Sequence, residues 1–402
     1  MGKTPLSLVG FAMPIETTKR RTDYFSIATQ KSIHFSAANQ RQKKITFFAD
    51  HPWIKDFKVL IFLSLDISSR IFRDGKSLFE NGLLNLDPPK HTQMRDIVNK
   101  AFTPRAMKDW EPRIQAITNE LLDDIEGERE IDLVEQLSYP LPVRVIAEML
   151  GVPAKDKRKF KDWSDQAVAG PANNSEEARS EQLRKQQQVV GELYAYFKEI
   201  IELKKMEPAD DIISVLLQAS VNGESLTEEE IVGFCILLLV AGNETTTNLI
   251  TNAIYTFLEY PEVYRQIKNE PDELLPAAIE EVLRFRSPVQ ASFRFVQEDV
   301  VLGGKELRAG EYVIAWMGAA NRDEKQFPNA EQFVVPRKPN LHMAFGRGIH
   351  FCLGAPLARM EAEIVLKEWI RRYPDFRLSA GFTLKPLEST FAYGIKELLL
   401  TV

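Results

Sequence analysis

A cysteine inside a glycine-rich loop is the first residue of this chain with evident chemistry. The segment 342–359 reads "HMAFGRGIHFCLGAPLAR" and places Cys352, one of two cysteines, directly before a stretch with apolar residues at helical spacing. A helix N-terminus favours the thiolate, which is the reactive and metal-binding form of cysteine. Gly346, Gly348 and Gly354 let the loop wrap so that backbone N–H groups point at the sulfur. A buried structural cysteine needs none of this, so the pattern predicts a loop that holds a thiolate ligand.

A second candidate site is the segment "AGNETTTN", residues 241–248, which follows a mostly apolar run. One interpretation is a solvated turn of helix in which threonines bond back to carbonyls. The other is a ligand groove, opened where a hydrogen bond from Thr245 to the carbonyl of Ala241 bends the helix. Gly242 would leave space in that groove. A small ligand would then lie beside the Thr245 hydroxyl and the Glu244 carboxylate.

The elements that must position these groups are mostly helices. Apolar residues three and four apart predict helices over 105–125, 139–152, 189–206, 227–260 and 272–285. The longest begins with Thr227 and Glu230, a capping box. Residues 170–188 indicate an exposed loop that runs into a polar helix, and short strand-like pieces occur at 291–296, 299–304 and 311–316. We therefore expect a mainly α fold with small β-sheets.

Composition excludes several classes of protein. The chain has 402 residues, 44% of them hydrophobic and 27% charged, as globular proteins do. Two cysteines and five histidines argue against a disulfide framework or a structural zinc site, and favour a reducing cytoplasm. The longest apolar run, 231–241, is about half of the ~20 residues that a membrane span needs, so no membrane anchor is expected. A net charge of -6 argues against a nucleic-acid partner.

Three motifs in order resemble those of the cytochrome P450 superfamily, the haem-thiolate monooxygenases. "FGRGIHFCLG" is similar to the haem-ligand signature, and "AGNETT" resembles the oxygen-binding segment of the long central helix. "EEVLRF" contains a Glu-x-x-Arg pair, Glu281 and Arg284. The similarity covers roughly residues 81–402 and is greatest to soluble bacterial members. It implies one haem domain over 1–402, with a long central helix over a haem and the cysteine loop beneath it.

The resemblance also implies the cofactor, haem b, and the residues around it. Cys352 would be the iron ligand, Phe345 would pack beside it, and Glu281 and Arg284 would be structural. Gln332 stands where many members carry an arginine that completes the Glu–Arg network, which leaves the third member of that network open. The remaining cofactor-binding positions, several of them cations for the haem propionates, are His91, Arg95, Ala241, Gly242, Arg294, His350 and Gly354.

The reaction implied is insertion of one oxygen atom from molecular oxygen into a C–H bond. Water ordered by Thr245 would supply protons, with Glu244 as the relay from solvent, and the donating thiolate assists O–O cleavage in this family. Two alternatives stay open. A peroxide-driven peroxygenase usually lacks such an acid–alcohol pair, and a non-catalytic haem sensor would need a signalling module that is not visible in the sequence.

Family position also implies the substrate pocket and the electron donor. A hydrophobic fatty acid, terpenoid or steroid is expected, with Gln290 and Ser292 as polar handles. The pocket residues would be Leu83, Leu84, Leu237, Val289, Gln290, Phe293 and Phe391. The chain holds no flavin or nicotinamide fingerprint, so we expect a cytoplasmic monomer that receives electrons from a ferredoxin or flavodoxin with its reductase. The expected docking patch is Lys100, Arg105, Lys108, Arg113 and Arg347.

The N-terminal region, residues 1–76, does not follow the family pattern that resumes at "NGLLNLDPPKH". Two explanations stay open. The region is a divergent N-terminus, or its reading frame is disrupted upstream of about Ser77 and its strands pair poorly. A well-formed sheet built from residues 20–75 would exclude the second explanation.

Overall fold

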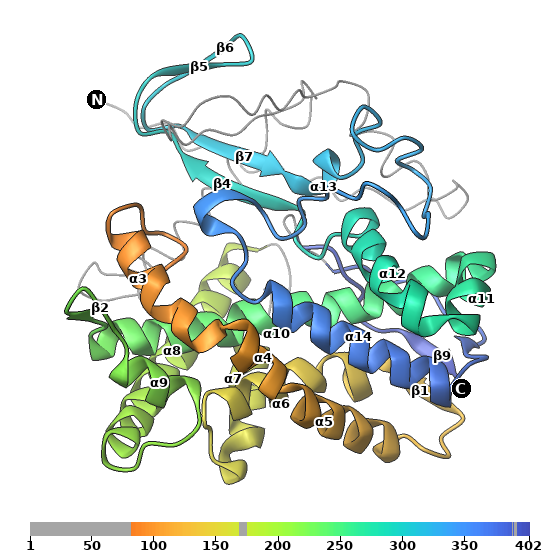
Figure 1. Cartoon of the computed structure of the whole chain (residues 1–402), viewed down its shortest axis with the longest axis horizontal. Coiled ribbons are helices and arrows are strands. Elements are labelled where there is room, and N and C mark those ends of the chain that lie inside the picture. The colour runs from red at the N-terminus through yellow and green to blue at the C-terminus, as the bar shows by residue number, and fades with distance from the viewer. Residues whose placement is uncertain (1–81, 169–174, 388, 390–391) are drawn as a thin grey trace.

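The computed structural model describes residues 82–168, 175–387, 389 and 392–402, and the N-terminal region lies outside this part of the chain. Helices make up most of it (Figure 1). The α-helices are α3 (Lys90–Val98), α4 (Pro104–Asp109), α5 (Glu111–Asp124), α6 (Pro140–Met149), α7 (Lys157–Val168), α8 (Glu176–Met206), α9 (Ile212–Gln218), α10 (Glu228–Glu259), α11 (Pro261–Asn269), α12 (Pro271–Phe285), α13 (Met317–Ala320) and α14 (Ala355–Arg372). This confirms the expected mainly α fold.

Short antiparallel strands form four small sheets in the described residues. The largest has the order β1-β9-β8, with Ile131 opposite Leu400. The others are hairpin-like pairs, β2 with β3, β4 with β7 and β5 with β6. The strands are β1 (Glu130–Asp132), β2 (Ser220–Val221), β3 (Glu224–Ser225), β4 (Ala291–Phe295), β5 (Val300–Leu302), β6 (Lys305–Leu307), β7 (Tyr312–Trp316), β8 (Arg377–Leu378) and β9 (Leu399–Thr401).

The central helix α10 lies in the core. The predicted capping box is present, because Thr227 Oγ1 accepts from the Glu230 N–H at 3.2 Å and the Glu230 carboxylate accepts from the Thr227 N–H at 2.9 Å. α6, α8, α12 and α14 all pack against it (Figure 1). Among the described residues α10 alone is long and apolar enough to cross a bilayer, but 61% of its most apolar window is buried inside the protein. Burial in the core explains its apolar sequence.

Two boundaries differ from the expected helices. The stretch expected as one helix over 105–125 divides at Trp110 into α4 and α5, because Pro112 has no N–H to continue a helix and instead takes its place in the first turn of α5. The polar helix expected within 170–188 and the helix expected over 189–206 are one continuous helix, α8, which begins at Glu176. There the Ser175 hydroxyl accepts from the Ala178 N–H at 3.1 Å and caps the helix.

Candidate functional site

The loop before α14 holds the Cys352 sulfur at a helix N-terminus, as the sequence predicted. The Cys352 N–H donates to the Phe345 carbonyl at 3.0 Å, which closes the loop. Gly346 and Gly348 have φ of +70° and +75°, in the left-handed region that glycine adopts without strain. Burial raises the pKa of the Cys352 thiol, while the N–H groups at the start of α14 act in the opposite direction. The site therefore favours a sulfur whose charge is shared with a cation, as in a metal ligand.

Helix α3 brings two of the predicted cations to this loop. The Arg95 guanidinium donates to the Phe351 carbonyl at 2.9 Å, next to Cys352 in the chain. The rings of His91 and His350 lie with centroids 4.4 Å apart, so these two predicted propionate ligands are adjacent. Lys90 pairs with the Glu230 carboxylate at 2.7 Å and thereby fixes α3 to the start of α10.

Arg294, the fourth predicted cation, lies on β4. Burial lowers the pKa of its guanidinium, which donates to the carbonyl of the adjacent Phe293 at 2.7 Å. A half-buried guanidinium is suited to an anion such as a carboxylate.

The middle of α10 carries the predicted acid and alcohol. Thr245 Oγ1 donates to the Ala241 carbonyl at 2.9 Å, so the predicted back-bond is present, and α10 continues through it as one helix. Ala241 is exposed although it lies mid-helix. Burial raises the pKa of Glu244, which makes this carboxyl a better proton carrier near neutral pH than an exposed glutamate.

Gly242 lies where α6 packs against α10. A Cβ at this position would lie 3.2 Å from Ile146 Cδ1, so the missing side chain lets α6 approach α10. Gly242 is itself half-buried, and its place beside a ligand stays a prediction.

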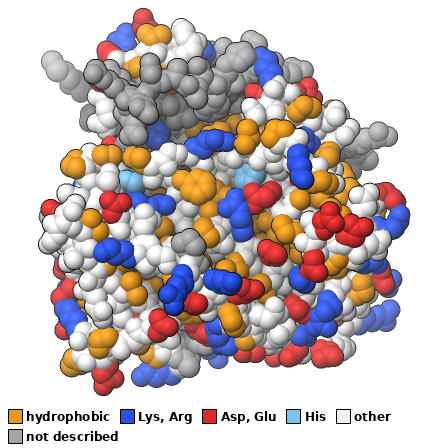
Figure 2. Space-filling view, in the orientation of Figure 1, with side chains coloured by type: hydrophobic (Ala, Val, Ile, Leu, Met, Phe, Trp, Pro, Cys, Tyr) orange, Lys and Arg blue, Asp and Glu red, His pale blue; other side chains and the backbone are white. Residues whose placement is uncertain are grey.

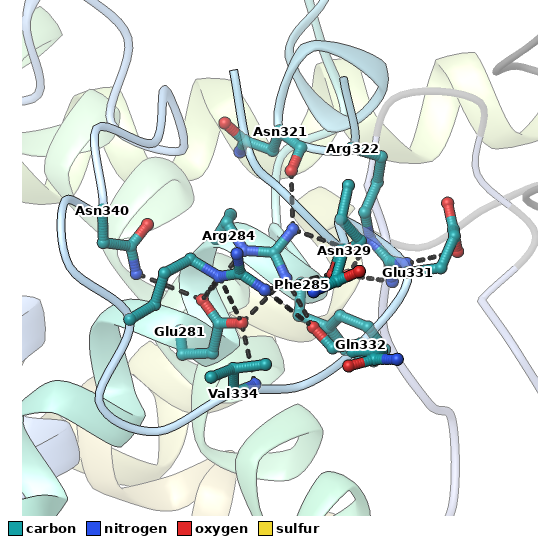
Figure 3. Close-up of polar contacts among 12 residues, drawn as sticks. Glu281, Arg284, Phe285, Asn321, Arg322, Asn329, Glu331, Gln332, Val334 and Asn340 are labelled. Atoms are coloured by element: carbon teal, nitrogen blue, oxygen red, sulfur yellow. Dashed lines mark hydrogen bonds and ion pairs between the residues drawn. The ribbon is translucent and has the colours of Figure 1, made fainter. Parts of the chain in front are cut away.

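A buried ion-pair network holds α12 to the loops that precede the cysteine (Figure 3). Glu281 and Arg284, both with fully buried side chains, pair through two contacts of 2.8 Å. The third member is Arg337, whose Nε donates to the Glu281 carboxylate at 2.9 and 3.1 Å. Gln332 contributes only its carbonyl, which accepts from both arginines at 3.0 and 3.1 Å. The place left open by Gln332 is thus filled by an arginine five residues further along the chain.

Comparison with known proteins gives one family. The family model described as Cytochrome P450 matches residues 1–379. The chain belongs to the cytochrome P450 family. It is 50% identical over 317 residues to the putative cytochrome P450 YjiB of Bacillus subtilis, which covers 79% of each chain.

Two solved structures of CYP109E1 from Bacillus megaterium are also similar to this P450. The complex with testosterone is 59% identical, covers 80% of this chain and 86% of that one, and gives a TM-score of 0.75. The complex with corticosterone is 56% identical, covers 84% of this chain and 90% of that one, and gives a TM-score of 0.76.

Haem is therefore the cofactor of this P450, as in the whole family, and the described residues fit it. One soft sulfur at a helix N-terminus suits the iron, and the basic side chains on α3, the loop and β4 suit the two propionates. The haem iron supplies the activation of dioxygen. Cys352 is the residue that would hold the iron, and Glu244 and Thr245 remain the predicted proton-delivering pair.

The predicted pocket residues are spread over several elements. Leu83 is buried, whereas Leu84 is 60% exposed. Leu237 is half-buried on α10, and Val289 bridges to Ala392. Phe293 packs on the small β4–β7 cluster. Phe391 lies outside the described residues.

Gln290, the expected polar handle, is already engaged by backbone. Its Nε2 donates to the Ser287 carbonyl at 2.6 Å. A Cβ on Gly318 would lie 2.0 Å from Gln290 Oε1, so the amide rests directly on this glycine. The structure thus gives Gln290 a role in fixing the turn before β4.

The sequence did not reveal a second carboxylate cluster beside the cysteine loop. Glu280, on α12, accepts from His342 Nε2 at 2.9 Å and from Arg359 at 2.6 and 3.0 Å. Arg359 Cζ lies 4.5 Å from the centre of the Phe345 ring. The sequence signal that could have indicated this cluster is the pair of neighbouring glutamates in "EEVLRF". Only one of them can face Arg284, so the other is left to bind a different partner.

Proposed function

We propose that this P450 hydroxylates a steroid, with Cys352 as the iron ligand and Glu244 and Thr245 as the proton-delivering pair. The observation that carries the substrate class is the identity of 59% and 56% to a P450 crystallised with testosterone and with corticosterone. A mainly apolar set of predicted pocket positions supports a hydrophobic substrate, because apolar lining with few polar groups is typical of such sites.

Spectral titration tests the substrate class directly. Testosterone, corticosterone, a terpene and a long-chain fatty acid are each added to the ferric enzyme, and the spin-state change on displacement of water is recorded. We expect saturable changes with both steroids at lower concentration than with the fatty acid or the terpene. Mass spectrometry of products formed with added redox partners then identifies hydroxylation. Saturation only with the fatty acid or the terpene would refute the steroid assignment.

Like other bacterial P450s, this enzyme needs a redox partner, and we propose an acidic ferredoxin or flavodoxin that docks over α4 and the cysteine loop. Arg105, Lys108 and Arg347 are exposed there. Figure 2 shows Lys and Arg side chains interspersed with Asp and Glu on this face of the molecule. Arg113 is less available, because Glu148 and Glu120 accept from its guanidinium. Lys100 donates to the Ser220 carbonyl at 2.5 Å. Phe351, 43% exposed on the loop, adds an apolar centre.

The docking surface is tested by the salt dependence of reduction. Arg347→Glu should slow the first reduction by the partner and flatten its dependence on ionic strength, since a rim charge acts mainly on the association rate. Arg265→Glu, on α11, is the matched control because its cation is engaged by Glu262. A rate that is independent of salt in the wild type would refute this surface. We also propose a cytoplasmic location, which agrees with neither Cys235 nor Cys352 forming a disulfide.

A further inference from the structure

Glu280 and Arg359 form a bidentate pair across two elements. The Glu280 carboxylate accepts from Arg359 Nε at 2.6 Å through one oxygen and from a terminal nitrogen at 3.0 Å through the other. These contacts hold the pKa of Glu280 down at about 2, because the hydrogen bonds from His342 and Arg359 outweigh burial, which acts to raise it. The carboxylate is thus charged under all working conditions. Its charge balances that of Arg359.

His342 adds a third member to this pair. Its Nδ1 accepts from the Ala344 N–H at 3.2 Å, so this nitrogen carries no proton. Nε2 therefore bears the hydrogen and donates to Glu280 at 2.9 Å. Glu280, Arg359 and His342 form one hydrogen-bonded cluster. They also tie α12 to the start of the cysteine loop and to α14.

Arg359 reaches the cysteine from this cluster in two ways. Its guanidinium lies over the Phe345 ring, and the Phe345 carbonyl accepts from the Cys352 N–H at 3.0 Å. The charge of Arg359 also acts on the Cys352 sulfur, less strongly than the charge of Arg95 does. A cation in this position favours negative charge on the sulfur and an added electron on the metal that it holds.

We propose that Glu280 is a positioning residue for the haem thiolate. Glu280 holds Arg359 against Phe345 and offsets the positive charge of Arg359. The inference rests on Cys352 as the iron ligand. Loss of the carboxylate leaves the Arg359 cation uncompensated and favours the ferrous state. Loss of the cation leaves the carboxylate and favours the ferric state. Loss of both restores the balance.

The test is spectroelectrochemical titration of the ferric–ferrous couple in four variants. Glu280→Gln should raise the midpoint potential and Arg359→Gln should lower it. Each change should alter the equilibrium constant of reduction by up to about tenfold, which corresponds to 59 mV for a one-electron couple. The double variant should return close to the wild-type value. Arg359→Lys keeps the charge and should stay closer to wild type than Arg359→Gln. Glu262→Gln, in an exposed pair on α11, is the matched control.

Opposite signs separate an electrostatic role from a merely structural one. If both single variants shift the potential in the same direction, or neither does, the proposal is overturned. The red-shifted ferrous–carbon monoxide band is recorded first in each protein. Absence of this band from the wild type would refute Cys352 as the ligand, and this outcome does not depend on the Glu280–Arg359 pair. Where a variant loads little haem, Arg359→Lys supplies the decisive comparison, because a potential equal to that of Arg359→Gln would exclude a charge effect.

Discussion

Replacement of Arg337 by Met tests whether it is the third member of the Glu281 network. Its side chain is 8% exposed, and both of its contacts to Glu281 are direct and charge-assisted. Removal of one partner from a buried ion pair costs about 3–5 kcal/mol, because it leaves a buried charge without compensation. Arg284 still pairs with Glu281 in the variant. We therefore expect the free energy of unfolding to fall by about 3 kcal/mol, the lower end of this range.

Gln332 provides the matched control for this experiment. Only its backbone carbonyl contacts the arginines, and alanine keeps that carbonyl, so Gln332→Ala should change stability by less than about 0.5 kcal/mol. Urea unfolding is followed by far-ultraviolet circular dichroism and by the haem absorbance, with the slope compared between variants. A loss for Gln332→Ala equal to that for Arg337→Met would show that the side chain at 332 completes the network, and would refute the assignment.

Three further predictions concern the thiolate, the proton path and a buried acid. Cys352→Ser should bind haem weakly and lose the red-shifted ferrous–carbon monoxide band; retention of the band would contradict the assignment. Thr245→Ala should still bind substrate but divert most reducing equivalents to hydrogen peroxide, measured as peroxide formed per NADPH consumed; unchanged coupling would mean that another group delivers protons. Glu361, buried with a hydrogen bond to Thr246, has its pKa raised by burial from 4.5 to about 8. The folded chain therefore keeps this proton where the unfolded chain loses it, and stability falls by a few kcal/mol as pH rises between these values. Glu361→Gln should remove this slope from urea unfolding, and an unchanged slope would contradict the shifted pKa.

Much of the site could be predicted because its determinants are local in sequence. The Thr227–Glu230 cap and the Thr245 back-bond each join residues three or four apart, so helical periodicity determines them. The cysteine loop was predictable for the same reason, since its glycines and the following helix are contiguous with Cys352.

The parts that the sequence did not reveal depend on contacts between distant residues. Arg337 reaches Glu281 over 56 positions, and only the path of the intervening loop decides which arginine folds back. Glu280 looks like an exposed helix carboxylate in the sequence, yet its partners His342 and Arg359 lie 62 and 79 positions away. The contact of the Gln290 amide with Gly318 and that of Gly242 with Ile146 of α6 likewise join residues far apart in the chain.

The adjacent carboxylates of α12 define a segment that a chimaeric enzyme should take from a single parent. Glu281 engages residues from 284 to 340, and Glu280 engages His342 and Arg359. A recombination crossover inside 280–359 would combine a carboxylate from one parent with cations that evolved beside another. Shuffling with homologues should therefore take this stretch whole from one parent. Exchange of segments outside it, such as 82–84 and 237–241, would vary predicted pocket residues and would leave both carboxylates with their native partners.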